Sequence, residues 1–153
     1  MSTLTVDPAL TLGLVVTDLV RRTELWQPHV RFTAGRRHAV RIAAADTYEA
    51  WLLTFRPGQS TGWHDHGGSA GAFAVVDGAL RERVHTDRGT TERLQLPGAI
   101  TAFDRAYVHD VAALYVPTVS IHVASPALTT MGYYDLRAGQ LALRAQKSTV
   151  EDW

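Results

Sequence analysis

Two histidines separated by one residue are the first feature of the sequence that suits a chemical role. His64 and His66 lie in WHDHGGSAG, where small residues follow them and no carboxylate does. Alternate side chains of a strand share one face, so the two imidazoles converge, as iron, zinc, copper or nickel requires. A third histidine, His109, follows a Pro-Gly turn further along the chain. The alternative is a polar pair on a loop, because short motifs often match by chance.

The elements expected to position these residues are one helix and many strands. A helix is predicted over about residues 7–25, with Asp7 as its cap, Pro8 in its first turn, and Arg21 and Arg22 near its end. From about residue 36 to 143, short apolar segments alternate with turn signals such as Asp-Gly and Pro-Gly. This texture predicts an all-β sandwich or barrel, in which residues 80–96 form a hairpin with one face exposed to solvent.

Composition limits the classes of function. The chain has 153 residues, which suits a single domain over residues 1–153. Its 15 basic and 15 acidic residues balance, so nucleic acid and anionic membranes are not expected as partners. It contains no cysteine, which excludes disulfides, thiolate ligands and a cysteine nucleophile. No apolar run is long enough to span a bilayer and no secretory signal is evident, so a cytoplasmic protein is expected.

The histidines and the glycines around them resemble the two motifs of the cupin superfamily. The first motif is matched by Gly58, His64, His66 and Gly78, and the second by Pro97, Gly98 and His109. The glutamate of the first motif is replaced by Gly71. The resemblance implies an all-β cupin, that is, a jelly-roll barrel, preceded here by the short helical segment.

In lacking that glutamate, the sequence resembles the thiol dioxygenase branch of the cupins. WLLTFRPGQSTGWHDHGGSAGAFAVVDGALRE and HDVAALYVPTVSIHVASPALTTMGYYD closely resemble bacterial members of the cysteine dioxygenase family. The resemblance covers roughly residues 36 to 137. It implies that His64, His66 and His109 bind Fe(II), leaving positions open for a thiolate and dioxygen. The implied reaction converts a small thiol acid to its sulfinic acid.

The same resemblance suggests further site residues. Arg41 matches the arginine that holds the substrate carboxylate, with Arg36 and Arg37 as alternatives if the register differs. Ser120 and His122 match a Ser-x-His-x-Tyr run on one face of a strand. Ala124 stands where the family has its tyrosine, and Gly71 stands where animal members carry the cysteine cross-linked to that tyrosine.

Several functions remain open. Cysteine is the favoured substrate, ahead of 3-mercaptopropionate or a larger thiol, because the mercaptopropionate enzymes place their arginine elsewhere. The missing tyrosine leaves a non-catalytic, metal-binding cupin module as an alternative. A cupin enzyme of another reaction type would need a fourth protein ligand, and Gly71 offers none. The sequence does not specify the metal or the oligomeric state.

Overall fold

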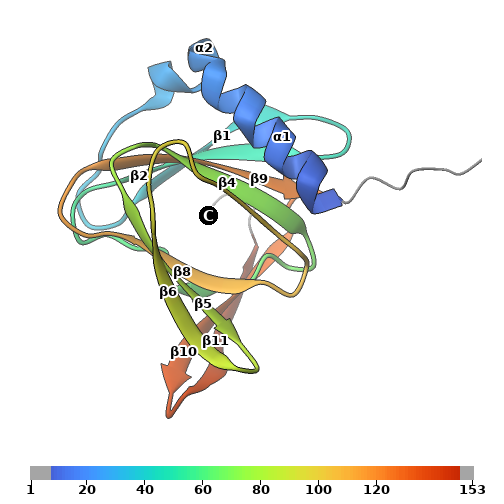
Figure 1. The fold of residues 1–153 in the computed structure, drawn as a ribbon, viewed down its shortest axis with the longest axis vertical. Helices are drawn as coiled ribbons and strands as arrows, with labels where there is room; N and C mark the ends of the chain where they lie inside the picture. Colours follow the sequence, from blue (N-terminus) through green and yellow to red (C-terminus); the bar gives the residue numbers. More distant parts are fainter. Residues whose placement is uncertain (1–7, 149–153) are drawn as a thin grey trace, which may run out of the picture.

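The computed structural model describes residues 8–148, which form two facing antiparallel sheets and a helical segment (Figure 1). Sheet A has the strand order β1-β2-β9-β4-β7, and sheet B has the order β11-β10-β3-β8-β5-β6. Strands β1 to β6 span His38–Ala44, Glu49–Phe55, Trp63–His64, Ala70–Asp77, Leu80–Thr86 and Gly89–Gln95. Strands β7 to β11 span Ile100–Phe103, Val108–Ala113, Thr118–Ser125, Thr130–Arg137 and Gln140–Ser148. The all-β prediction is confirmed.

The helical segment covers the outer face of sheet A. Helix α1 spans Pro8–Arg21, a short α2 spans Thr23–Trp26, and a 3-10 turn, η1, spans Gln27–His29. The predicted helix is therefore interrupted at Arg22, whose φ of −90° and ψ of 69° are not helical. Asp7, the expected cap, lies outside the described residues. Because α1 packs on β4, β7 and β9, Leu12, Val16 and Leu19 become buried on the sheet, whereas Leu14 stays exposed (Figure 1).

Sheet A has an apolar environment on both faces, and strand β2 shows this most clearly. Trp51, Leu53 and Phe55 point between the two sheets, whereas Ala50 and Leu52 point toward the helical segment. Every residue of β2 is buried for this reason. Its central part, AWLL at residues 50–53, therefore reads as a continuous apolar run, not as an alternation. Sheet A thus forms one wall of the barrel interior.

Two hairpins belong to sheet B. The predicted hairpin is present as β5 and β6, which pair antiparallel from Leu80 and Gln95 to the turn. The β10–β11 hairpin extends away from the helical side of the molecule (Figure 1). The motif glycine Gly78 makes the turn between β4 and β5 with a φ of 89°, and a Cβ there would lie 2.5 Å from the Pro117 carbonyl oxygen. Both the conformation and the space therefore require glycine.

None of the helices in residues 8–148 is long and apolar enough to cross a membrane.

Candidate metal centre

The three predicted histidines meet in the barrel interior. One ring nitrogen from each of His64, His66 and His109 lies within 4.8 Å of the other two, and all three side chains are buried. Strand β3 ends at His64, so His66 lies just beyond it, which corrects the expectation of one strand for both. Asp65 nevertheless continues the pairing, because its N–H donates to the Gly132 carbonyl oxygen at 2.9 Å. The alternation that turns both imidazoles inward is thereby kept.

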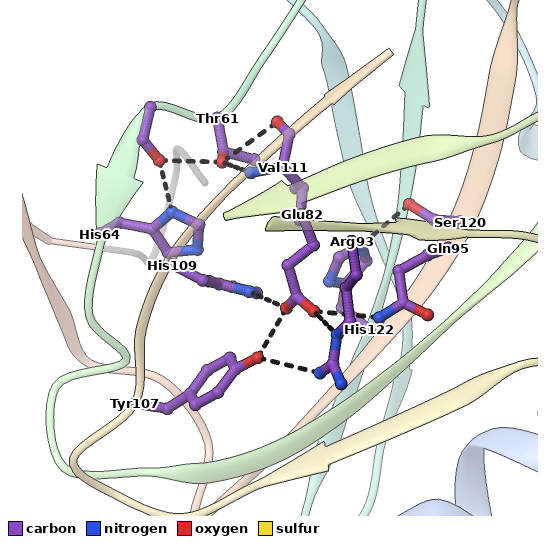
Figure 2. A network of polar contacts seen from close by, with 11 residues as sticks. Thr61, His64, Glu82, Arg93, Gln95, Tyr107, His109, Val111, Ser120 and His122 are labelled. Carbon is purple, nitrogen blue, oxygen red and sulfur yellow. Dashed lines mark hydrogen bonds and ion pairs between the residues drawn. The ribbon is translucent and has the colours of Figure 1, made fainter. Parts of the chain in front are cut away.

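Hydrogen bonds fix which nitrogen of each ring faces the centre. Nδ1 of His64 donates to the Gly62 carbonyl oxygen at 2.9 Å, and Nδ1 of His109 donates to the Glu82 carboxylate at 2.7 Å (Figure 2). His66 is hydrogen-bonded to the backbone of Tyr107. Among the described residues, Nε2 of His109 and Nδ1 of His66 have no hydrogen-bond partner. Buried nitrogens without partners are what a cation would satisfy.

The environment keeps the imidazoles of His64 and His66 neutral. Burial lowers the pKa of His64 and His66 well below the ordinary value of 6.5, and the charge of the neighbouring His109 lowers both further. A neutral ring has a free lone pair, which is the form that binds a metal ion. Among the residues that the structure describes, this is the only cluster of potential ligands, and it contains no carboxylate.

Glu82 is the principal residue that the sequence reasoning missed. Its carboxylate is fully buried and accepts four hydrogen bonds (Figure 2). One oxygen accepts from His109 Nδ1 and the Tyr107 hydroxyl, both at 2.7 Å. The other accepts from Arg93 Nε at 2.9 Å and Gln95 Nε2 at 3.0 Å. Burial alone would raise the pKa of Glu82, but the hydrogen bonds, led by that of His109, hold it at about 2.

The sequence does contain a signal for Glu82. In LRERVH, Glu82 is in phase with Leu80 and Val84, whereas Arg81 and Arg83 occupy the alternate positions. A carboxylate on the apolar face of a strand must be satisfied inside the protein. The phase of the alternation, read residue by residue, therefore predicts a buried acceptor on β5.

Asp65 ties the ligand-bearing segment to strand β10. One carboxylate oxygen accepts from the Gly67 N–H at 3.0 Å and the Gly132 N–H at 2.8 Å. The other accepts from the Tyr134 hydroxyl at 2.6 Å. Asp65 therefore points away from the histidine cluster. Its hydrogen bonds fix the backbone around His64 and His66 to Gly67 and to strand β10.

The wall opposite the histidines comes from sheet A. Ser120 Oγ lies 2.8 Å from His122 Nε2, as predicted for the Ser-x-His pair, and the His122 ring stacks on Phe73 with centroids 5.1 Å apart. Burial lowers the pKa of His122 well below 6.5, and the charges of His109 and Arg37 lower it further. A cavity of about 10 Å³, at the lower limit of what can hold one water, lies beside His66 and His122 and is also lined by Trp51, Phe103, Val123, Ala124 and Leu128.

Arg41 in strand β1 and the two arginines that precede this strand lie in different environments. Arg41 is in register with Trp51, which places it on the inward face of β1, in the same row as His122. Its guanidinium forms an ion pair with the buried Glu49 at 3.7 Å, and its side chain is 55% exposed. Arg37 is buried, and its charge lowers the pKa of both His64 and His122. Arg36 is exposed. The contact of Arg41 with a substrate stays a prediction.

The fold and the three-histidine cluster together define a cupin with a candidate metal centre. A family model described as cysteine dioxygenase type I matches residues 14–137, and the chain belongs to that family. A search of curated proteins found no match.

Solved structures support the fold. The chain is similar to TT1209 from Thermus thermophilus, with 22% identity, a TM-score of 0.59, and coverage of 66% of this chain and 93% of that one. An RmlC-like cupin from Desulfovibrio desulfuricans gives 19% identity, a TM-score of 0.57, and coverage of 65% and 91%. KdgF from Halomonas sp. gives 18% identity, a TM-score of 0.57, and coverage of 67% and 91%.

Proposed function

We propose that this protein is a mononuclear non-haem iron thiol dioxygenase that converts a small thiol acid, with cysteine favoured, to its sulfinic acid. The observation that carries the proposal is the cluster of three buried histidine nitrogens with no carboxylate among them. Membership of the cysteine dioxygenase family supports the same reaction class. When bound, Fe(II) supplies the redox chemistry that joins dioxygen to sulfur.

A divalent cation bound by the three histidines would favour an anionic ligand. Imidazole ligands carry no negative charge, so the three histidines would leave the charge of a divalent cation uncompensated. A thiolate can compensate it, whereas a neutral alcohol cannot. Glu82 does not compensate it directly, since its two oxygens are engaged by four donors, one of them His109. Its role is to orient His109 and to strengthen that ring as a donor.

Sheet A is proposed to bind the remainder of the substrate. Arg41 shares a row with Trp51 and His122 and is only partly engaged by Glu49, so it can bind a substrate carboxylate. Ser120 fixes the His122 ring at 2.8 Å, which sets where its other nitrogen points. With Ala124 in place of a tyrosine, the adjacent cavity has room for about one water, and a water there can connect His122 to the substrate.

Ala124 also favours a second candidate, a metal-binding cupin module without turnover. The phenol that completes the Ser-x-His-x-Tyr run is replaced by a methyl group, and no hydroxyl-bearing side chain is among the residues that line the adjacent cavity. In that case metal would bind to the histidines with no thiol-dependent uptake of oxygen.

The test is oxygen consumption by protein purified anaerobically and loaded with one equivalent of Fe(II). L-cysteine, 3-mercaptopropionate and cysteamine are compared, and the sulfinic acid is identified by the mass of two added oxygen atoms. His109→Ala should abolish both metal binding and uptake. His85→Ala is the matched control, because His85 contacts Thr90 on the neighbouring strand and lies outside the cluster. Bound iron without uptake for any of the thiols would refute the dioxygenase and support the binding module.

A further inference from the structure

Gly71 occupies a position where no side chain fits. In sheet A it lies between Phe103 of β7 and Ala124 of β9. A Cβ built on Gly71 would be 2.6 Å from Cε2 of Phe103, closer still to Cζ, and 2.8 Å from the Val123 carbonyl oxygen. Gly71 does not have a positive φ, so the backbone conformation does not demand glycine here. Glycine is needed here because there is no space for a side chain, and the Phe103 ring occupies most of that space.

The ring of Phe103 is held firmly against the histidine cluster. Its centroid lies 4.4 Å from that of His66 and 5.6 Å from that of His109. On its other side it stacks on Tyr107, with centroids 4.6 Å apart and the planes inclined by 11°. The Tyr107 hydroxyl in turn donates to Glu82, which orients His109. The ring position and the ligand geometry are therefore fixed by one network.

We propose that Phe103 fills the place of a fourth protein ligand and thereby determines which ligands the metal accepts. This inference rests on the proposed metal centre. A side chain from position 71 would project toward the cluster through the volume that the Phe103 ring occupies. The ring offers no donor atom, so the metal keeps its full charge and its open positions for small anions from solution, thiolates in particular.

The geometry also indicates where a fourth ligand can be introduced. Position 71 is unsuitable even without the ring, because the Val123 carbonyl oxygen would still lie 2.8 Å from the added Cβ. Position 103 already carries a side chain that reaches His66. Glutamate is smaller than phenylalanine and places its carboxylate in the volume of the ring. Phe103→Glu should therefore add a ligand where Gly71→Glu would disrupt the sheet.

The experiment compares Phe103→Glu with Phe103→Gln, which has the same shape without the charge, using Co(II) as the probe. We expect Phe103→Glu to bind Co(II) about tenfold more tightly than Phe103→Gln, as an added charged ligand implies. Its cobalt absorption spectrum should change, and the sulfur-to-cobalt absorption on addition of L-cysteine should need about ten times more thiol. Phe103→Gln should retain the wild-type response to cysteine within a few-fold.

A double-mutant cycle tests the packing step separately, by chemical unfolding of metal-free protein. Gly71→Ala should destabilise the wild type more than it destabilises the Phe103→Leu background, because leucine lacks the Cζ and Cε2 atoms, whereas the contact with the Val123 carbonyl oxygen is common to both. Additive costs would overturn the proposal. So would a folded Phe103→Glu variant that binds Co(II) no more tightly than Phe103→Gln, or a wild type that binds no metal. A wild type that binds Co(II) but no thiol refutes the proposed function alone, since the comparison of metal affinities still stands.

Discussion

Replacing Glu82 with glutamine should weaken both the fold and the metal centre, because all four partners of this carboxylate are donors. Glutamine keeps the shape but presents one oxygen and one NH2 group. The NH2 group must therefore face either the pair His109 and Tyr107 or the pair Arg93 and Gln95. The second orientation costs less, because the Arg93 side chain is 56% exposed and can turn to water.

The magnitude follows from this preferred orientation. The buried amide of Gln95 loses its acceptor, and an unsatisfied buried donor costs about 1–3 kcal/mol. The bonds from His109 and Tyr107 persist but no longer meet a charged acceptor, which costs roughly 1 kcal/mol more. We expect Glu82→Gln to lower the free energy of unfolding by about 3 kcal/mol, at the lower end for a broken buried ion pair. Loss of the charge behind His109 should weaken metal binding about tenfold or more.

Two assays check this prediction: urea unfolding of the metal-free protein, and Co(II) titration against a competing chelator. Glu92→Gln is the matched control, since Glu92 lies on the neighbouring strand β6, is 56% exposed and contacts Arg81. It should change the free energy of unfolding by less than about 0.5 kcal/mol and leave metal affinity unchanged. If Glu82→Gln loses under about 1 kcal/mol with unaltered metal affinity, the hydrogen-bond account of Glu82 is wrong.

Three further changes have expected outcomes. Glu49→Gln should lower the KM for thiols that bear a carboxylate by several-fold, because it releases the Arg41 guanidinium from its 3.7 Å ion pair, and steady-state oxygen uptake measures this. Ala124→Tyr should destabilise the fold by about 1–3 kcal/mol in urea, because the adjoining cavity of about 10 Å³ cannot hold a phenol. Tyr134→Phe should cost about 1–2 kcal/mol through the lost bond to Asp65. Burial, reinforced by Asp65, raises the pKa of Tyr134 from 10.0 to about 12. The stability that the Tyr134 hydroxyl contributes is therefore intact below pH 10 and falls between pH 10 and 12. Tyr134→Phe should not show this fall.

Each of these has a control and a contrary result. Tyr115, which is 89% exposed, is the control for Tyr134, and Tyr115→Phe should show no change in urea. Cysteamine is the control substrate for Glu49→Gln, because it has no carboxylate; an equal change in its KM would contradict the release of Arg41. An Ala124→Tyr variant as stable as the wild type would show that the wall beside Leu128 yields to admit a phenol.

The fold and the three histidines of the candidate metal centre could be predicted because each depends on local pattern. Turn signals and short apolar runs identify the strands, and the spacing of His64, His66 and His109 fits two known motifs. The short β3 strand was not predictable in this way. It is defined by pairing with β8 and β10 on either side, which are distant in sequence, so its end at His64 depends on tertiary contacts.

The environment of the ligands was harder to predict. In the sequence, Phe103 looks like an ordinary core residue. Only its pairing with Gly71 across the two strands shows that its ring occupies the space of a side chain at position 71. In GRRHAVR, Arg37 and Arg41 are in the same phase of alternation, so both are candidates for the interior. The structure separates them: Arg37 is buried, whereas Arg41 is 55% exposed and paired with Glu49. That difference depends on the tertiary surroundings of each arginine, which the local sequence pattern does not encode.

The division of labour between the two sheets has a consequence for how such a protein can diversify. His64, His109 and Glu82 belong to sheet B, whereas Arg41, His122 and Phe103 belong to sheet A. Under the proposed function, sheet B would hold the cation and sheet A would contact the substrate. Substitutions at Arg41 or His122 could then change the choice of substrate while the three histidines keep their positions, so the proposed enzyme could acquire new substrates without first losing its metal.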